Sequence, residues 1–186
     1  MNKQFLDRSK VMELTLCALF VALTAIGAFI KIPTPLAPLS LQVLFVIMAG
    51  IILGPRLGFI SQIAYIGLGL IGLPIFALGG GPTYIFQPTF GFLLGFAAAA
   101  FVIGEIVNRT RPATLISLIF AGIAGLLTIY LIALPYMYYM MHAYLGMDIH
   151  FTAIVWSACV IFLPGDLIKL ILASYLSLKI KSALKI

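Results

Sequence analysis

Residues 154–178 read IVWSACVIFLPGDLIKLILASYLSL. The run is long enough to cross a bilayer as a helix, yet it holds a carboxylate, Asp166, and an ammonium, Lys169. Ionisable groups at membrane depth cost on the order of a few kcal/mol each and usually line a cavity or pathway. Because the i,i+3 spacing puts both side chains on one helix face, the stretch predicts a membrane helix that offers an acceptor and a cation to one polar solute.

Two interpretations of this pair remain open. Asp166 and Lys169 could form an internal ion pair that only fixes helix packing. Alternatively, Lys169 could bind a ligand carboxylate and Asp166 could accept ligand N–H groups. Pro164-Gly165 directly precedes the pair, and local unwinding is common where a span forms a binding site. The position of Pro164-Gly165 therefore favours the ligand-binding interpretation.

The composition of the whole chain agrees with a membrane location. Of its 186 residues, 63% are hydrophobic and 9% are charged, whereas soluble domains average about 25% charged residues. A net charge of +6 is typical of basic cytoplasmic loops in membrane proteins, so no nucleic-acid partner is predicted. At this length one bundle is expected rather than two domains.

Apolar runs divide the chain into helices. Runs of about 17 to 25 residues span a bilayer, and the second run, which ends at Gly54-Pro55, is short for a full crossing. The sequence predicts an all-α integral membrane protein with one membrane domain, residues 1–186, and six transmembrane helices at about 11–30, 39–53, 57–73, 89–107, 113–139 and 152–178.

The distribution of positive charge predicts the orientation of these helices. Lys31 lies on one side of the six-span arrangement and Lys169 lies within a span. All other basic residues fall on the opposite side, so the positive-inside rule predicts a multi-pass protein of the cell membrane with both termini cytoplasmic. These residues are Lys3, Arg8, Lys10, Arg56, Arg109, Arg111, Lys179, Lys181 and Lys185.

Two outer connections are uncharged and rich in Pro or Gly. They read IPTPLAPLS at 32–40 and ALGGGPTYIFQP at 77–88. Irregular backbone near membrane depth is tolerated where it is buried in protein or lines a cavity, and Gly79 permits close approach to another surface. Both connections are predicted to be lids over a pocket that opens outward; two tight, partly buried connectors are the alternative.

Polar and aromatic side chains near these lids are candidate ligand contacts. Gln42 and Gln87 could each donate to and accept from an amide or ureido group, or could cap a helix end. Tyr84 lies within the second lid, and Phe45 lies near Gln42. Tyr139 belongs to a group of tyrosines that either lines the pocket or forms a membrane-interface belt.

The first span carries small residues at Ala18, Ala22 and Ala25. Small side chains four residues apart let another helix approach closely. The three alanines are therefore candidates for docking a separate membrane subunit, and internal packing is the alternative.

The chain holds no recognisable catalytic motif. It has no Ser/His/Asp set and no phosphate-binding loop, and its cysteines and histidines fit no metal-ligand spacing, so no metal site is predicted. Active transport would need an ion gradient or a partner. The alternatives to a binding subunit are an integral-membrane enzyme that uses Asp166 and Lys169 as acid and base, and a purely structural membrane subunit.

Ordered motifs over residues 31–175 resemble BioY, the family of biotin-specific S components of energy-coupling factor transporters. Phe90 is a departure, because the family more often has Gly there. The matching motifs are PTP at 33–35, LQ at 41–42, AG at 49–50, LGPRLG at 53–58, GLPIFA at 72–77, GGG at 79–81, PTFGFLLGF at 88–96 and LPGDLIK at 163–169.

The resemblance implies a six-helix membrane protein that binds biotin from outside with high affinity. It implies a transmembrane coupling protein and two cytoplasmic ATPases as partners, with Ala18 and Ala22 in the motif that contacts the coupling protein. Biotin would be the transported ligand, and no cofactor is implied. Whether Asp166 and Lys169 meet the carboxylate or the ureido group stays open.

Overall fold

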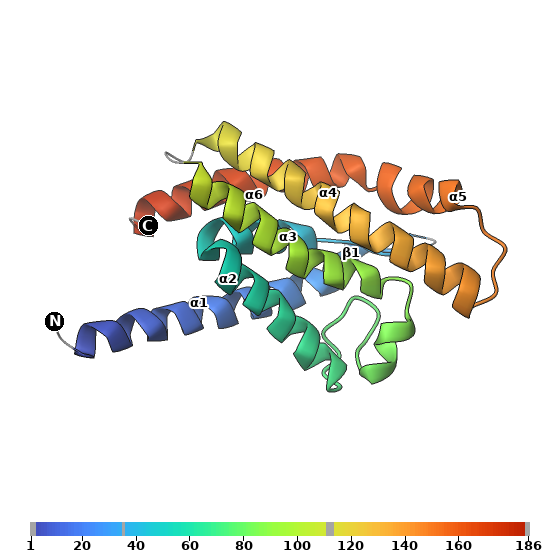
Figure 1. The fold of residues 1–186 in the computed structure, drawn as a ribbon, viewed down its shortest axis with the longest axis horizontal. Coiled ribbons are helices and arrows are strands. Elements are labelled where there is room, and N and C mark those ends of the chain that lie inside the picture. The colour runs from blue at the N-terminus through green and yellow to red at the C-terminus, as the bar shows by residue number, and fades with distance from the viewer. Residues whose placement is uncertain (1–2, 35, 111–113, 185–186) are drawn as a thin grey trace.

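The computed structural model describes residues 3–34, 36–110 and 114–184. Some residues used in the loop, charge and span predictions lie outside the described residues: Pro35, Arg111, Ala113 and Lys185. Long helices dominate the architecture, and the two termini lie at the same end of the bundle (Figure 1). These helices are α1 (Lys3–Phe29), α2 (Gln42–Leu70), α3 (Phe90–Arg109), α4 (Leu115–Tyr139) and α6 (Leu163–Leu184).

Five stretches of the described residues are long and apolar enough to cross a membrane, whereas the sequence predicted six spans. The difference lies in α2, which covers both the span predicted at 39–53 and the span predicted at 57–73. The candidate spans are Lys10–Phe29, Gln42–Leu70, Phe90–Arg109, Leu115–Tyr144 and Phe151–Ala183.

Helix α2 is not straight, because it breaks at Gly54. This residue has φ 78° and ψ −176°, outside the helical region, and Pro55 follows it. Gln42 Nε2 donates to Tyr65 Oη at 2.9 Å, although a straight helix would separate two residues so far apart by about 35 Å. The two arms of α2, residues 42–53 and 55–70, therefore fold back on each other at the predicted Gly54-Pro55 boundary.

Glycines bring α3 very close to this turn. A Cβ atom on Gly104 of α3 would lie 2.3 Å from the backbone nitrogen of Pro55, and one on Gly50 of α2 would lie 2.8 Å from the carbonyl oxygen of Ala100. On the other side of α3, a Cβ atom on Gly95 would lie 3.0 Å from Ile129 of α4. Small residues thus place α3 between α2 and α4, as is common in membrane bundles.

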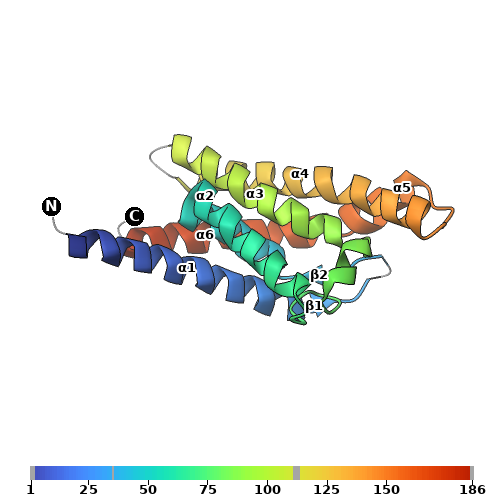
Figure 2. The same ribbon diagram turned by 60° about the horizontal axis from the view of Figure 1, so that its bottom comes forward.

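The two outer connections fold toward the end opposite the termini (Figure 2). The first forms a short antiparallel ribbon of β1 (Lys31–Ile32) and β2 (Leu39–Ser40). The second contains a 3₁₀ turn, η1 (Pro82–Phe86). Lys31 Nζ donates to the carbonyl oxygen of Ala77, so the ribbon and the second connection are tied together.

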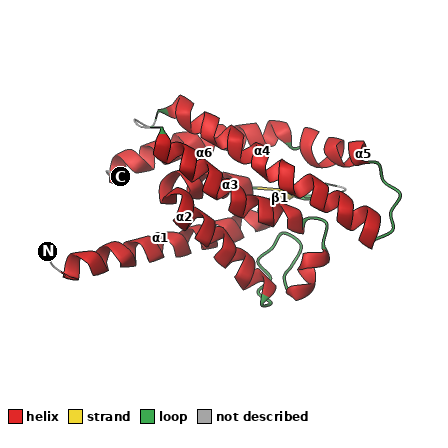
Figure 3. Cartoon of the chain, in the orientation of Figure 1, coloured by secondary structure: helices red, strands yellow, loops and turns green. Residues whose placement is uncertain are grey.

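The last predicted span is a composite of helical segments (Figure 3). It starts with α5 (Phe151–Val155), passes through a π-helical turn, η3 (Trp156–Val160), and ends with α6. A second π-helical turn, η2 (Met140–Tyr144), extends α4. Pro164 lies in the first turn of α6, where a missing backbone N–H costs little. The irregularity predicted around Pro164-Gly165 therefore lies just upstream, and Asp166 falls in the first turn of α6.

Candidate ligand-binding site

Asp166 and Lys169 face the interior of the bundle, where they are 3% and 6% exposed. The two side chains share one helix face, as the i,i+3 spacing predicted, and Lys169 Nζ pairs with Asp166 Oδ1. Tyr130 of α4 donates its hydroxyl proton to the other carboxylate oxygen, Oδ2. The carboxylate thus has a cation beside one oxygen and a hydroxyl donor on the other.

Lys169 also connects α6 to the outer ribbon. Its Nζ donates to the carbonyl oxygen of Ser40 in β2 at 2.9 Å. Among the described residues, the Lys169 ammonium thus contacts both the Asp166 carboxylate and the Ser40 carbonyl.

Hydrogen bonds continue from Ser40 across α2. Ser40 Oγ donates to Gln42 Oε1 at 3.0 Å, and Gln42 Nε2 donates to Tyr65 Oη at 2.9 Å. Tyr65 Oη in turn donates to the carbonyl oxygen of Ile75 at 2.9 Å. The polar side chains from both arms of α2 therefore belong to the same network as the ion pair on α6.

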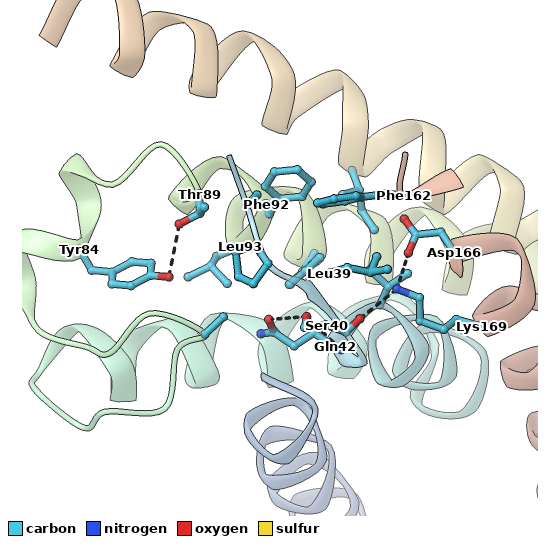
Figure 4. A pocket seen from close by; sticks show the side chains of 16 residues that line it. Leu39, Ser40, Gln42, Tyr84, Thr89, Phe92, Leu93, Phe162, Asp166 and Lys169 are labelled. Atoms are coloured by element: carbon cyan, nitrogen blue, oxygen red, sulfur yellow. Dashed lines mark hydrogen bonds and ion pairs between the residues drawn. The ribbon is translucent and has the colours of Figure 1, made fainter. Parts of the chain in front are cut away.

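A cavity of about 520 Å³, the part open to solvent included, lies beside this network. Asp166 and Lys169 lie at one end and Tyr84 and Thr89 at the other, with Gln42 on the wall between them (Figure 4). Its volume and its few convergent polar groups are typical of small-molecule sites. The apolar lining residues are Leu39, Val43, Phe92, Leu93, Phe96, Ile129 and Phe162, with Ala37, Pro38 and Ala77 from the two outer connections.

The far end of the cavity is polar but uncharged. Tyr84 Oη and Thr89 Oγ1 lie 3.4 Å apart within hydrogen-bond reach. Burial raises the pKa of the Tyr84 phenol, so this hydroxyl is an uncharged hydrogen-bonding group at neutral pH. The two ends of the cavity therefore differ in chemistry, with an ion pair at one and two hydroxyls at the other.

Four of the eight side chains predicted to contact a ligand line this cavity. They are Asp166, Lys169, Gln42 and Tyr84. Tyr84 lines the cavity from the second outer connection, and Ala77 and Ala37 show that both outer connections contribute to the lining.

The structure places the other four predicted residues outside the cavity lining. Phe45 packs toward α1, where its ring would lie 2.9 Å from a Cβ atom on Gly27. Gly79 exchanges backbone hydrogen bonds with Phe76 in a tight turn. Gln87 is exposed at the end of η1, and Tyr139 is 62% exposed at the end of α4, as in an interface belt.

The sequence analysis missed Ser40, Tyr65, Thr89 and Tyr130. Tyr65 and Tyr130 carried a usable signal, because both lie in the interior of apolar runs rather than at the membrane interface, where tyrosines gather. A buried tyrosine hydroxyl normally has a hydrogen-bond partner. Ser40 carried no such signal. Lys169 donates to its backbone carbonyl, and any residue at that position would supply a carbonyl.

The small residues of α1 divide between two environments. Ala18 and Ala22 are exposed, whereas Ala25 is half-buried and packs against the core. Leu14 and Ile26, one turn to either side of the exposed pair, are 71% and 52% exposed. Ala18 and Ala22 therefore form a shallow strip on an uncovered apolar face of α1.

Comparison with known proteins identifies the family. The BioY family model matches residues 1–186. The chain is 52% identical over 142 residues to the probable biotin transporter BioY of Lysinibacillus sphaericus, covering 76% of this chain and 72% of that protein. It is 35% identical over 184 residues to the probable biotin transporter BioY of Bacillus subtilis (strain 168), covering 95% of this chain and 94% of that protein.

A solved structure shows the same fold. The S-component for biotin from an ECF-type ABC transporter superposes with a TM-score of 0.84 at 25% sequence identity, covering 98% of this chain and 95% of that chain. The resemblance inferred from the ordered motifs is confirmed: the chain belongs to the BioY family.

Proposed function

We propose that this protein is the biotin-binding membrane subunit of an energy-coupling factor transporter in the cell membrane. The observation that carries the proposal is the cavity with an ion pair at one end and two hydroxyls at the other. Relatives are named biotin transporters. Those names favour transport over catalysis, so Asp166 and Lys169 are assigned a binding role and no acid–base role.

Biotin matches this cavity in its chemical groups. Its ureido ring has two N–H donors and one carbonyl acceptor, its valerate tail ends in a carboxylate, and its fused rings are apolar. Asp166 accepts hydrogen bonds, Lys169 donates them, and Gln42 does both. The rings would lie against the apolar walls, which exclude water and so strengthen the polar contacts.

The proposed topology has six crossings with both termini in the cytoplasm. The break at Gly54 supports two crossings by α2, and the common end of the bundle that holds both termini (Figure 1) supports an even number. Lys10 and Lys179 lie near those termini, as the positive-inside rule requires of cytoplasmic ends.

Isothermal titration calorimetry of biotin against the detergent-purified protein tests the binding function. We expect saturable one-to-one binding, because the polar groups converge on one cavity. Thiamine, whose cationic thiazolium ring does not match an inward-facing Lys169, is the control ligand and should produce no saturable heat. Absence of biotin binding by a protein that remains folded in the same detergent would reject the proposed function.

A transmembrane coupling protein and two cytoplasmic ATPases are proposed as partners, with Ala18 and Ala22 on the docking face. Ala18→Trp and Ala22→Trp should each abolish co-purification with the coupling protein and ATP-driven uptake, because an indole blocks close helix approach. Both variants should bind biotin in isolation like the wild type.

The matched control for these variants is Leu131→Trp, at an α4 position that is 74% exposed. It adds an indole to a different exposed face and should leave co-purification unchanged. Normal assembly of both alanine variants would place the docking face elsewhere. Loss of biotin binding by them would instead indicate that the alanines pack within the subunit.

A further inference from the structure

Tyr65 lies behind the cavity and does not line it, yet it contacts a residue that does. It is fully buried on the second arm of α2, and its hydroxyl lies 2.9 Å from Gln42 Nε2 on the first arm. The same hydroxyl lies 2.9 Å from the carbonyl oxygen of Ile75. These two contacts determine which way the hydroxyl proton points.

A carbonyl oxygen can only accept a hydrogen bond, and a phenol has a single proton. The Tyr65 proton is therefore committed to Ile75, and toward Gln42 the hydroxyl can act only as an acceptor. The Gln42 group that faces Tyr65 must then be the NH₂ end of the amide. Tyr65 thus selects one of the two orientations that a glutamine amide can adopt.

Ser40 is compatible with the same orientation, but its hydroxyl could also accept from an amide N–H, so the choice of orientation rests on Tyr65. The Ser40 hydroxyl lies 3.4 Å from the backbone N–H of Gln42, from which it can accept, and donates its proton to Gln42 Oε1 at 3.0 Å. In the opposite orientation, the amide oxygen would face the Tyr65 hydroxyl, whose proton is already donated to Ile75. A buried polar group without a partner costs stability.

We propose that Tyr65 is a positioning residue for the ligand. It prevents the Gln42 amide from flipping, so the second N–H of the amide and the free lone pair of its oxygen each stay at a fixed position in the cavity; we call this arrangement the lock. Such a lock suits a neutral amide or urea group, which pairs one donor with one acceptor. The inference rests on the proposed biotin-binding function, because the ureido ring of biotin is a group of this class.

A double-mutant cycle on biotin affinity, measured by calorimetry, tests the lock. Tyr65→Phe removes only the hydroxyl and should weaken biotin binding about fivefold, the factor that one neutral hydrogen bond commonly contributes. In a Gln42→Leu background, the same Tyr65→Phe change should have no further effect, because there is no amide left to orient. Tyr175→Phe, a change at a half-exposed position of α6, is the matched control and should bind like the wild type.

The outcomes separate this inference from the proposed function. If wild-type protein binds biotin and Tyr65→Phe binds equally well, the lock is rejected while the function stands. An equal fold-loss of affinity from Tyr65→Phe in both backgrounds would show that Tyr65 affects binding independently of the Gln42 amide and would also reject the lock. Where either variant melts below the assay temperature, the cycle is repeated at a lower temperature at which both are folded; equal affinity of Tyr65→Phe and wild type there would reject the lock.

Discussion

Lys169→Met should weaken biotin binding about 10- to 100-fold, since a hydrogen bond to a charged group contributes roughly 1.5–3 kcal/mol. The change keeps the length of the side chain but removes the cation that pairs with Asp166 and holds the Ser40 carbonyl of β2. Asp166→Asn should have an effect of similar size, because it removes the charged acceptor. Calorimetry with biotin measures the loss of affinity, and thermal unfolding of the ligand-free proteins measures any loss of stability.

The same experiment separates a ligand-binding role from a packing role. Removing one member of a buried ion pair is destabilising whatever its function, so each single variant should also melt earlier. The double variant Asp166→Asn/Lys169→Met should recover stability but not affinity. Recovery of both would show that the pair only fixes packing. Lys179→Met, an exposed position of α6, is the matched control and should leave affinity unchanged.

Gly104→Ala should be among the most damaging small substitutions in the bundle. The added methyl would lie 2.3 Å from the nitrogen of Pro55 and 2.5 Å from the carbonyl carbon of Gly54. These are backbone atoms of a turn, so no side chain can rotate away, and α3 must separate from α2. Overpacking of this kind costs about 1–3 kcal/mol and occasionally more, and the melting temperature in detergent should fall accordingly.

Gly67→Ala on α2 is the matched control, because nothing lies within 4 Å of the added methyl. Alanine is the better helix former by about 1 kcal/mol, so this variant should be at least as stable as the wild type. Equal melting temperatures for the Gly67 and Gly104 variants would contradict the close contact between α3 and the α2 turn.

The sequence could not predict which residues of the two outer connections line the cavity. The sequence predicted both outer connections as lids, and both line the cavity, but it could not select among their residues. Tyr84 lines the cavity whereas Gly79 and Gln87 do not. The connections lack the helical period that assigns a residue to a face, and their backbone path follows from contacts such as that between Lys31 and the carbonyl of Ala77.

The sequence by itself determined the properties that depend on neighbouring residues. Apolar run length set the helices, Gly54-Pro55 set the break in α2, and the i,i+3 spacing put Asp166 and Lys169 on one face. Only the tertiary structure decided that the two arms of α2 fold back on each other, and that Lys169 reaches Ser40, 129 positions away. The partners of a buried polar group are whichever donors and acceptors the packed helices bring near it, and that choice is made by the packing of the whole bundle rather than by any local pattern.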